Sequence, residues 1–169
     1  MSHRRLRLTC AVVLVVSLLL PGLAAGLHKG QVAPPLQVTS TSGQRITNAN
    51  YGGRVLLVQF FATWCTPCQE SIPALVRLSK RYGKEGFQVL GLCIDETGER
   101  TVKPFIAAKK ITYPVALATD ALQDSFGIRS VPTLFLINRK GQVVEKFMGM
   151  SDETVQALES AIKTALADK

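Results

Sequence analysis

Two cysteines that follow a short apolar run restrict the possible fold of this chain more than any other feature. Residues Val55–Phe61 have the length and the apolar, β-branched start of a buried strand. Cys65 and Cys68 come next, and Pro67 between them suits a first helical turn, where a missing N–H is tolerated. The pattern therefore predicts a buried strand, then both cysteines at the N-terminus of a helix.

This position favours the thiolate form of a cysteine, because unpaired N–H groups and the helix dipole stabilise negative charge. We expect the pKa of Cys65 to lie below the free-thiol value of about 8.5, so that it attacks disulfides at neutral pH. Zinc sites share the spacing but need two more ligands. The other candidates are Cys10, His3, His28 and Cys93. The first two fall in the leader described next and Cys93 in an apolar strand run, so neither metal nor cofactor is expected.

The first 26 residues have the layout of a signal peptide. Arg4, Arg5 and Arg7 precede an uncharged apolar run, which ends in small residues. Residues 8–27 carry no charge and are long enough to cross a bilayer, so a retained membrane anchor is the alternative. We predict a leader or anchor over residues 1–26 and one exported domain over residues 27–169, in the periplasm or on the outer face of a bacterial cytoplasmic membrane.

Export and charge narrow the function further. Disulfides persist in exported proteins, and a lone C-x-x-C pair without framework cysteines indicates redox exchange. The formal net charge is +8, but three arginines lie in the leader. The later basic residues are scattered, with only Lys109-Lys110 and Arg139-Lys140 adjacent, so no nucleic-acid-binding stripe is predicted.

Strands and helices alternate along the chain, which indicates an α/β fold with a mainly parallel sheet. A leading hairpin is expected, with strands at residues 33–38 and 45–46 on either side of the polar turn of residues 39–44. Pro73 should kink the helix that carries the cysteines. Ser151 should cap the final helix. Further strands are predicted over residues 88–95, 115–118, 133–137 and 142–148, and helices over residues 65–82, 100–110 and 120–126.

Several motifs together make the chain resemble the thioredoxin superfamily, in particular the exported TlpA/ResA-like thiol–disulfide oxidoreductases of the redoxin group. The resemblance implies a thioredoxin-like fold with a central mixed sheet flanked by helices, an N-terminal β-hairpin and a βα insertion over residues 88–118. The matching motifs are Trp64-Cys65-Thr66-Pro67-Cys68, Val131-Pro132-Thr133, the hairpin with Asn138-Arg139-Lys140-Gly141, and the leading hairpin before Tyr51-Gly52-Gly53.

The resemblance also implies roles for individual residues. Cys65 would attack a client disulfide and Cys68 would resolve the mixed disulfide, the two forming the redox disulfide. A cis bond would precede Pro132, leaving the backbone of Val131 free to pair with an extended client segment. Trp64 would either belong to the binding surface or fill the core.

The chain departs from the family at the buried acid–base group. Gln59 stands where thioredoxin has an aspartate, and Ser71 stands where many TlpA/ResA-like relatives have a glutamate. Glu70 would then be either a substitute carboxylate or a solvated partner of the helix dipole, and the preference for acids at helix starts favours the second.

Three functions remain open. The favoured one is a monomeric oxidoreductase that reduces client disulfides, for example in apocytochrome c or a copper-site assembly protein, and is recharged by a membrane thiol donor of the DsbD/CcdA type. The second is a thiol peroxidase of the peroxiredoxin branch, which would need threonine or serine at Ala62. The third is a non-catalytic protein holding Cu(I) between Cys65 and Cys68, with Met148 or Met150 as soft ligands.

Overall fold

The computed structural model describes residues 26–168. The leader or membrane anchor predicted over residues 1–26 lies outside this range except for Gly26. Within residues 26–168, none of the helices is both long and apolar enough to span a membrane.

A five-stranded mixed sheet forms the centre of the domain, in the order β5, β4, β3, β6, β7. β3 is parallel to β4 and β4 to β5, whereas β6 is antiparallel to both β3 and β7. The strands are β3 (Val55–Phe61), β4 (Phe87–Cys93), β5 (Val115–Leu117), β6 (Thr133–Ile137) and β7 (Val143–Met148).

The prediction of a mainly parallel sheet is therefore wrong, while the mixed sheet implied by the resemblance is confirmed. Helix α4 (Asp120–Phe126), which connects β5 to β6, has seven residues and so is only about 10 Å long. Such a short helix does not carry the chain back along the sheet. β5 ends beside the end of β4, and β6 begins beside the end of β3, at the same edge of the sheet. β6 must then run in the opposite direction.

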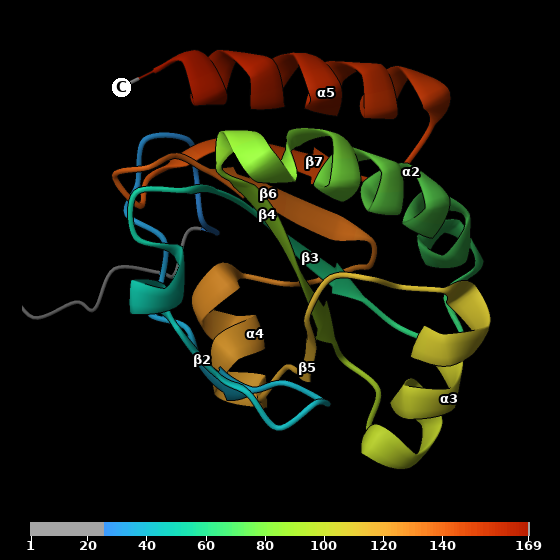
Figure 1. Ribbon diagram of the computed structural model, residues 1–169. Helices are drawn as coiled ribbons and strands as arrows, with labels where there is room; N and C mark the ends of the chain where they lie inside the picture. The colour runs from blue at the N-terminus through green and yellow to red at the C-terminus, as the bar shows by residue number, and fades with distance from the viewer. Residues whose placement is uncertain (1–25, 169) are drawn as a thin grey trace, which may run out of the picture.

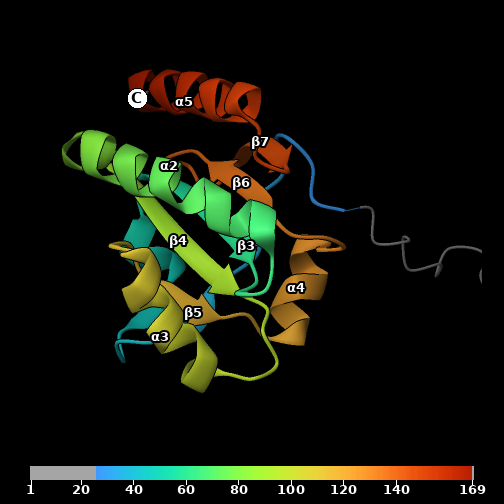
Figure 2. The same cartoon turned by 90° about the vertical axis from the view of Figure 1, so that its right-hand side faces the viewer.

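Helices cover both faces of the sheet, and every residue of β3 is consequently buried. Figures 1 and 2 show α2 (Thr66–Tyr82) and α5 (Asp152–Ala167) together on one side and α4 on the other. Side chains of α2, α5 and α3 (Glu99–Lys109) share one core cluster with Val55 and Leu57. Alternate residues of β3, such as Leu56, join α4 and the N-terminal segment in a second cluster.

The helices follow the predicted pattern. α2 is continuous through Pro73, and the predicted kink there stays a prediction. Ser151 caps α5 by accepting a 3.2 Å hydrogen bond from the N–H of Thr154, as predicted. Leu158 and Ile162 on α5 are fully buried, so this helix covers the sheet as its apolar spacing indicates.

The N-terminal segment binds two edges of the sheet. Its hairpin consists of β1 (Gln37–Thr39) and β2 (Arg45–Thr47), and two short 3₁₀ helices, η1 (Asn48–Tyr51) and η2 (Gly83–Glu85), lie in later connections. Beside the hairpin, the N–H of Thr41 donates to the carbonyl of Val115 at 2.8 Å on the outer side of β5. Before it, the N–H of Ala33 donates to Gly141 at 2.9 Å and that of Gly30 to Val143 at 2.7 Å, at the start of β7.

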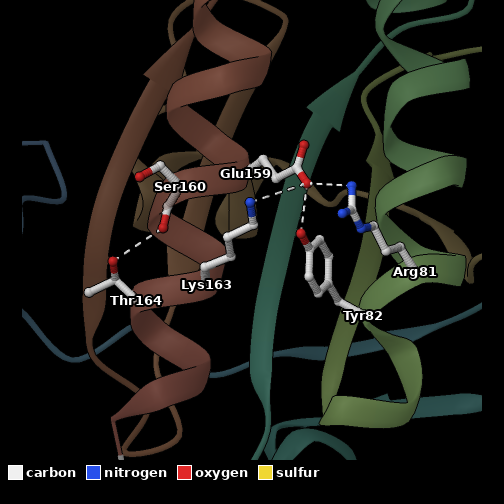
Figure 3. A network of polar contacts seen from close by, with 6 residues as sticks. All are labelled: Arg81, Tyr82, Glu159, Ser160, Lys163 and Thr164. Carbon is white, nitrogen blue, oxygen red and sulfur yellow. Dashed lines mark hydrogen bonds and ion pairs between the residues drawn. The ribbon is translucent and has the colours of Figure 1, made fainter.

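A polar cluster joins the end of α2 to α5 (Figure 3). The hydroxyl of Tyr82 donates to Glu159 at 2.6 Å, and Arg81 pairs with the same carboxylate oxygen at 2.9 Å. Lys163 approaches that oxygen at 3.8 Å. The hydrogen bond from Tyr82, followed by the nearby positive charges, lowers the pKa of Glu159, and the same bond raises the pKa of Tyr82.

Candidate active site

Cys65 and Cys68 form a disulfide where β3 leads into α2. The strand ends at Phe61, a turn carries residues 62–65, and Cys65 is the N-cap residue of the helix. Cys65 retains 5% of its surface and Cys68 retains none. Because the second cysteine lies under the first turn of α2, only the first borders the surface.

Backbone hydrogen bonds place the sulfur of Cys65 at the helix N-terminus. Its Sγ accepts the N–H of Cys68 at 3.2 Å, the position at which a capping serine or aspartate would offer oxygen. The carbonyl of Cys65 accepts the N–H of Gln69 at 3.1 Å. Pro67, in the first turn of the helix, removes no needed donor. A thiolate on Cys65 would therefore meet an N–H donor and the positive end of the helix dipole.

The turn that carries Trp64 is fixed through Thr63. The N–H of Thr63 donates to Oδ1 of Asp95 at 2.9 Å, and its hydroxyl donates to Oδ2 of the same carboxylate. On the other side, the carbonyl of Thr63 accepts from Nε2 of Gln69 at 2.8 Å. All three polar groups of Thr63 are thus bound, two residues before Cys65.

A second chain of hydrogen bonds lies on the buried side of the disulfide. The hydroxyl of Tyr113 donates to Oε1 of Gln59 at 3.2 Å, and Nε2 of Gln59 donates to Oγ of Ser71 at 3.2 Å. Ser71 in turn donates to the carbonyl of Cys68 at 2.7 Å. Gln59 is completely buried, and burial raises the pKa of Tyr113 further above neutrality. Neutral side chains therefore occupy the positions at which the resemblance placed a carboxylate.

Glu70 does not supply the missing carboxylate on this side. It is exposed and lies just beyond the first turn of α2. A residue adjacent to buried Ser71 on a helix points about 100° away from it. The structure thus agrees with the solvated alternative for Glu70.

Cys93 is fully buried at the end of β4. Burial raises the pKa of its thiol to about 12. This thiol is therefore neutral at physiological pH and unreactive, which agrees with a role in packing.

The second predicted motif reaches the same edge of the sheet. Thr133 pairs with Phe60 near the end of β3, so Val131 and Pro132 lie at the edge that carries the disulfide. The Val131–Pro132 bond is cis, as the resemblance implied. Pro132 is buried and Val131 half-buried, and among residues 26–168 no hydrogen bond engages the N–H or the carbonyl of Val131.

Trp64 is 69% exposed, so the alternative that it fills the core is wrong. Met148, which pairs with Thr133 across the β6–β7 hairpin, is 63% exposed. Large exposed apolar side chains are uncommon in this domain, and two of them stand at this edge. Contiguous apolar patches, rather than single exposed residues, mark surfaces that contact other molecules.

The copper-binding alternative gains no specific support from this arrangement. Met150 is half-buried and packs against the core cluster that contains α2 and α5. The described part of the chain contains no group of three or more histidine, cysteine, aspartate or glutamate side chains that could hold a metal ion.

Sequence reasoning did not find Asp95, Thr63, Gln69 or Tyr113. For Asp95 a signal was available, because it is the last residue of the strand predicted over residues 88–95, and neighbouring parallel strands end at one edge of a sheet. Tyr113 offered no such signal. Its partner Gln59 lies in a different strand, and no spacing in the sequence relates the two.

Comparisons with known proteins show the family of this chain. The model of the Redoxin family matches residues 28–165. Thiol-disulfide oxidoreductase ResA of Bacillus thuringiensis is 30% identical over 96% of this chain and 98% of its own length, and ResA of Bacillus subtilis is 28% identical over 76% of this chain and 72% of its own. The crystal structure of a putative thiol:disulfide interchange protein DsbE from Chlorobium tepidum is 29% identical, with a TM-score of 0.79 over 84% of this chain and 100% of its own. The chain belongs to the redoxin family and is a TlpA/ResA-like thiol–disulfide oxidoreductase of the thioredoxin superfamily.

Proposed function

We propose that this chain reduces disulfides in exported client proteins, with Cys65 as the attacking thiol and Cys68 as the resolving thiol. The difference in position between the two cysteines carries the proposal. Cys65 caps α2 at the surface and its sulfur receives an N–H, whereas Cys68 is completely buried beneath it. An incoming disulfide can meet only the first sulfur.

The exchange then proceeds in two substitutions. The Cys65 thiolate attacks one sulfur of the client disulfide, which forms a mixed disulfide and releases the other client sulfur as a thiolate. The Cys68 thiolate next attacks the sulfur of Cys65 and releases the second client thiolate. The client gains two electrons, and the protein is left with the Cys65–Cys68 disulfide, the pair that is bonded in this structure.

The surface around Cys65 suits an extended polypeptide. Trp64 offers an exposed ring, and the unbound backbone groups of Val131 can pair with a client strand. We place apocytochrome c and copper-site assembly proteins among the candidate clients and a membrane thiol donor of the DsbD/CcdA type as the source of electrons. The protein would act as a monomer.

We place this reaction outside the cytoplasm, in the periplasm or on the outer face of the cytoplasmic membrane. The support is the charge and apolar pattern of residues 1–26, which would be removed as a signal peptide or kept as an anchor. Residues 27–169 would then form the exported thioredoxin-like domain.

Trapping of mixed disulfides tests these roles. Cys68→Ser should attack once and stay linked to its client through Cys65, whereas Cys65→Ser should form no adduct and lose insulin reduction. Cys93→Ala is the matched control and should keep turnover, because its thiol is buried and neutral. Adducts that accumulate in Cys65→Ser but not in Cys68→Ser would reverse the assignment, and peroxide consumption by the wild type without disulfide reduction would support the peroxidase alternative.

A further inference from the structure

Asp95 is the only buried charged side chain among residues 26–168, and it lies beside the active-site turn. It follows β4 directly, and Phe61 at the end of β3 is aligned with Cys93 at the end of β4. Asp95 therefore lies at the edge of the sheet from which the Cys65 turn emerges.

A carboxylate in such a place needs compensation for the water that it loses. In the described part of the chain, no lysine or arginine forms an ion pair with Asp95. The nearby Cys93 thiol is neutral. The hydrogen bonds that satisfy the carboxylate come from Thr63, one to each oxygen.

These two hydrogen bonds restrain the turn of residues 62–65. They hold the N–H and the hydroxyl of Thr63 while Gln69, in α2, holds its carbonyl. Two residues later, Cys65 must place its sulfur within reach of the N–H of Cys68. A rotation of the Thr63 peptide would move the N-cap residue and spoil that alignment.

We propose that Asp95 is a positioning residue for Cys65, which by binding Thr63 holds the N-cap turn in the geometry that stabilises the Cys65 thiolate. This inference rests on the attacking role proposed above for Cys65. It assigns Asp95 no contact with the client and no part in moving a proton.

The reactivity of reduced Cys65 towards iodoacetamide, followed over pH, tests the proposal. Without the Thr63–Asp95 bonds, Asp95→Ala should raise the measured pKa of Cys65 by about one unit, which lowers its thiolate fraction and alkylation rate about tenfold at pH values well below that pKa. Thr63→Val loses only the hydroxyl bond and should show a smaller fall, whereas Thr63→Ser keeps the hydroxyl and should recover most of the rate. Glu99→Ala, which removes an exposed carboxylate, controls for net charge.

The direction of the pKa change separates positioning from simple charge. If Asp95 acted only through its negative charge, its removal would lower the pKa of Cys65 and speed alkylation, and that result would overturn the proposal. Unchanged alkylation in folded Asp95→Ala would overturn it as well. If Asp95→Ala does not fold, the Thr63→Val and Thr63→Ser pair decides, because both keep the buried carboxylate. Peptide mapping identifies the cysteine that iodoacetamide has alkylated. Alkylation of Cys68 in place of Cys65 would refute the attacking role proposed for Cys65, which is a different outcome from failure of the role proposed for Asp95.

Discussion

Gln59 and Tyr113 should show strong energetic coupling, because each is the hydrogen-bond partner of the other at a buried position. The amide of Gln59 is completely buried, and Tyr113 is 5% exposed. Gln59→Leu preserves most of the side-chain volume but leaves the Tyr113 hydroxyl without its acceptor. Tyr113→Phe in turn leaves Oε1 of Gln59 without its donor.

The expected magnitude follows from the cost of an unsatisfied buried polar group. Each single substitution should lower the free energy of unfolding by about 1–3 kcal/mol. The double variant Gln59→Leu/Tyr113→Phe removes both partners, and Ser71 keeps its bond to the Cys68 carbonyl. It should therefore lie within about 1 kcal/mol of the wild type, since replacing both partners of a buried hydrogen bond can be nearly neutral.

Urea unfolding of the oxidised proteins, followed by far-UV circular dichroism, measures this coupling. Tyr51→Phe is the matched control, because Tyr51 is also buried but its hydroxyl makes no hydrogen bond within residues 26–168. That control should change stability by less than about 0.5 kcal/mol. Losses in the double variant equal to the sum of the two single losses would refute the reasoning, since independent sites add.

Two further predictions concern regions away from the disulfide. Arg139 donates to the carbonyls of Gly53 at 2.9 Å, Leu166 at 3.2 Å and Glu85 at 3.4 Å. Arg139→Lys should lower the free energy of unfolding, measured in urea titrations, by about 1–2 kcal/mol, because an ammonium cannot reproduce the planar fork of the guanidinium. Wild-type stability in this variant would show that these three hydrogen bonds do not stabilise the fold. Glu159→Gln should be less stable than the wild type at pH 7. Because the pKa of Glu159 is lowered in the folded state, this loss of stability should be fully present above pH 4.5, the ordinary pKa of a glutamate, and should vanish as the pH falls through the folded-state pKa. A loss of stability that persists at pH 2 would show that the charge of Glu159 is not its cause.

Local patterns in the sequence were sufficient to predict most helices and strands. The apolar run of β3, Pro67 beside the cysteines and Ser151 before α5 each determine structure within a few residues of themselves. The direction of β6 could not be predicted this way, because it depends on how far α4 reaches across the sheet. The predicted strand at residues 33–38 is likewise shorter, beginning at Gln37, since Pro34 and Pro35 have no N–H for a ladder.

The residues of the site likewise fall into two groups, those that a short motif identifies and those that only the assembled fold brings together. Cys65, Cys68 and Pro132 belong to short motifs that can be recognised without a structure. The groups that support them act across the fold: Asp95 reaches Thr63, and Tyr113 reaches Gln59, only after the strands have assembled in their order. Gln59 and Ser71 can be recognised from the sequence as replacements for acidic residues, but the bond between them depends on the packing of α2 on β3.

The attachment of the N-terminal segment to two edges of the sheet affects the order of folding. Residues 30–41 are synthesised before every strand of the central sheet, yet their partners are Gly141 and Val143 at one edge and Val115 at the other. Gly30 and Ala33 have no place to bind until the last hairpin of the domain has formed, whereas Thr41 needs only β5. A chain that emerges N-terminus first therefore keeps these early residues unpaired until the end of synthesis, and the β7 edge stays open to other strands until they dock.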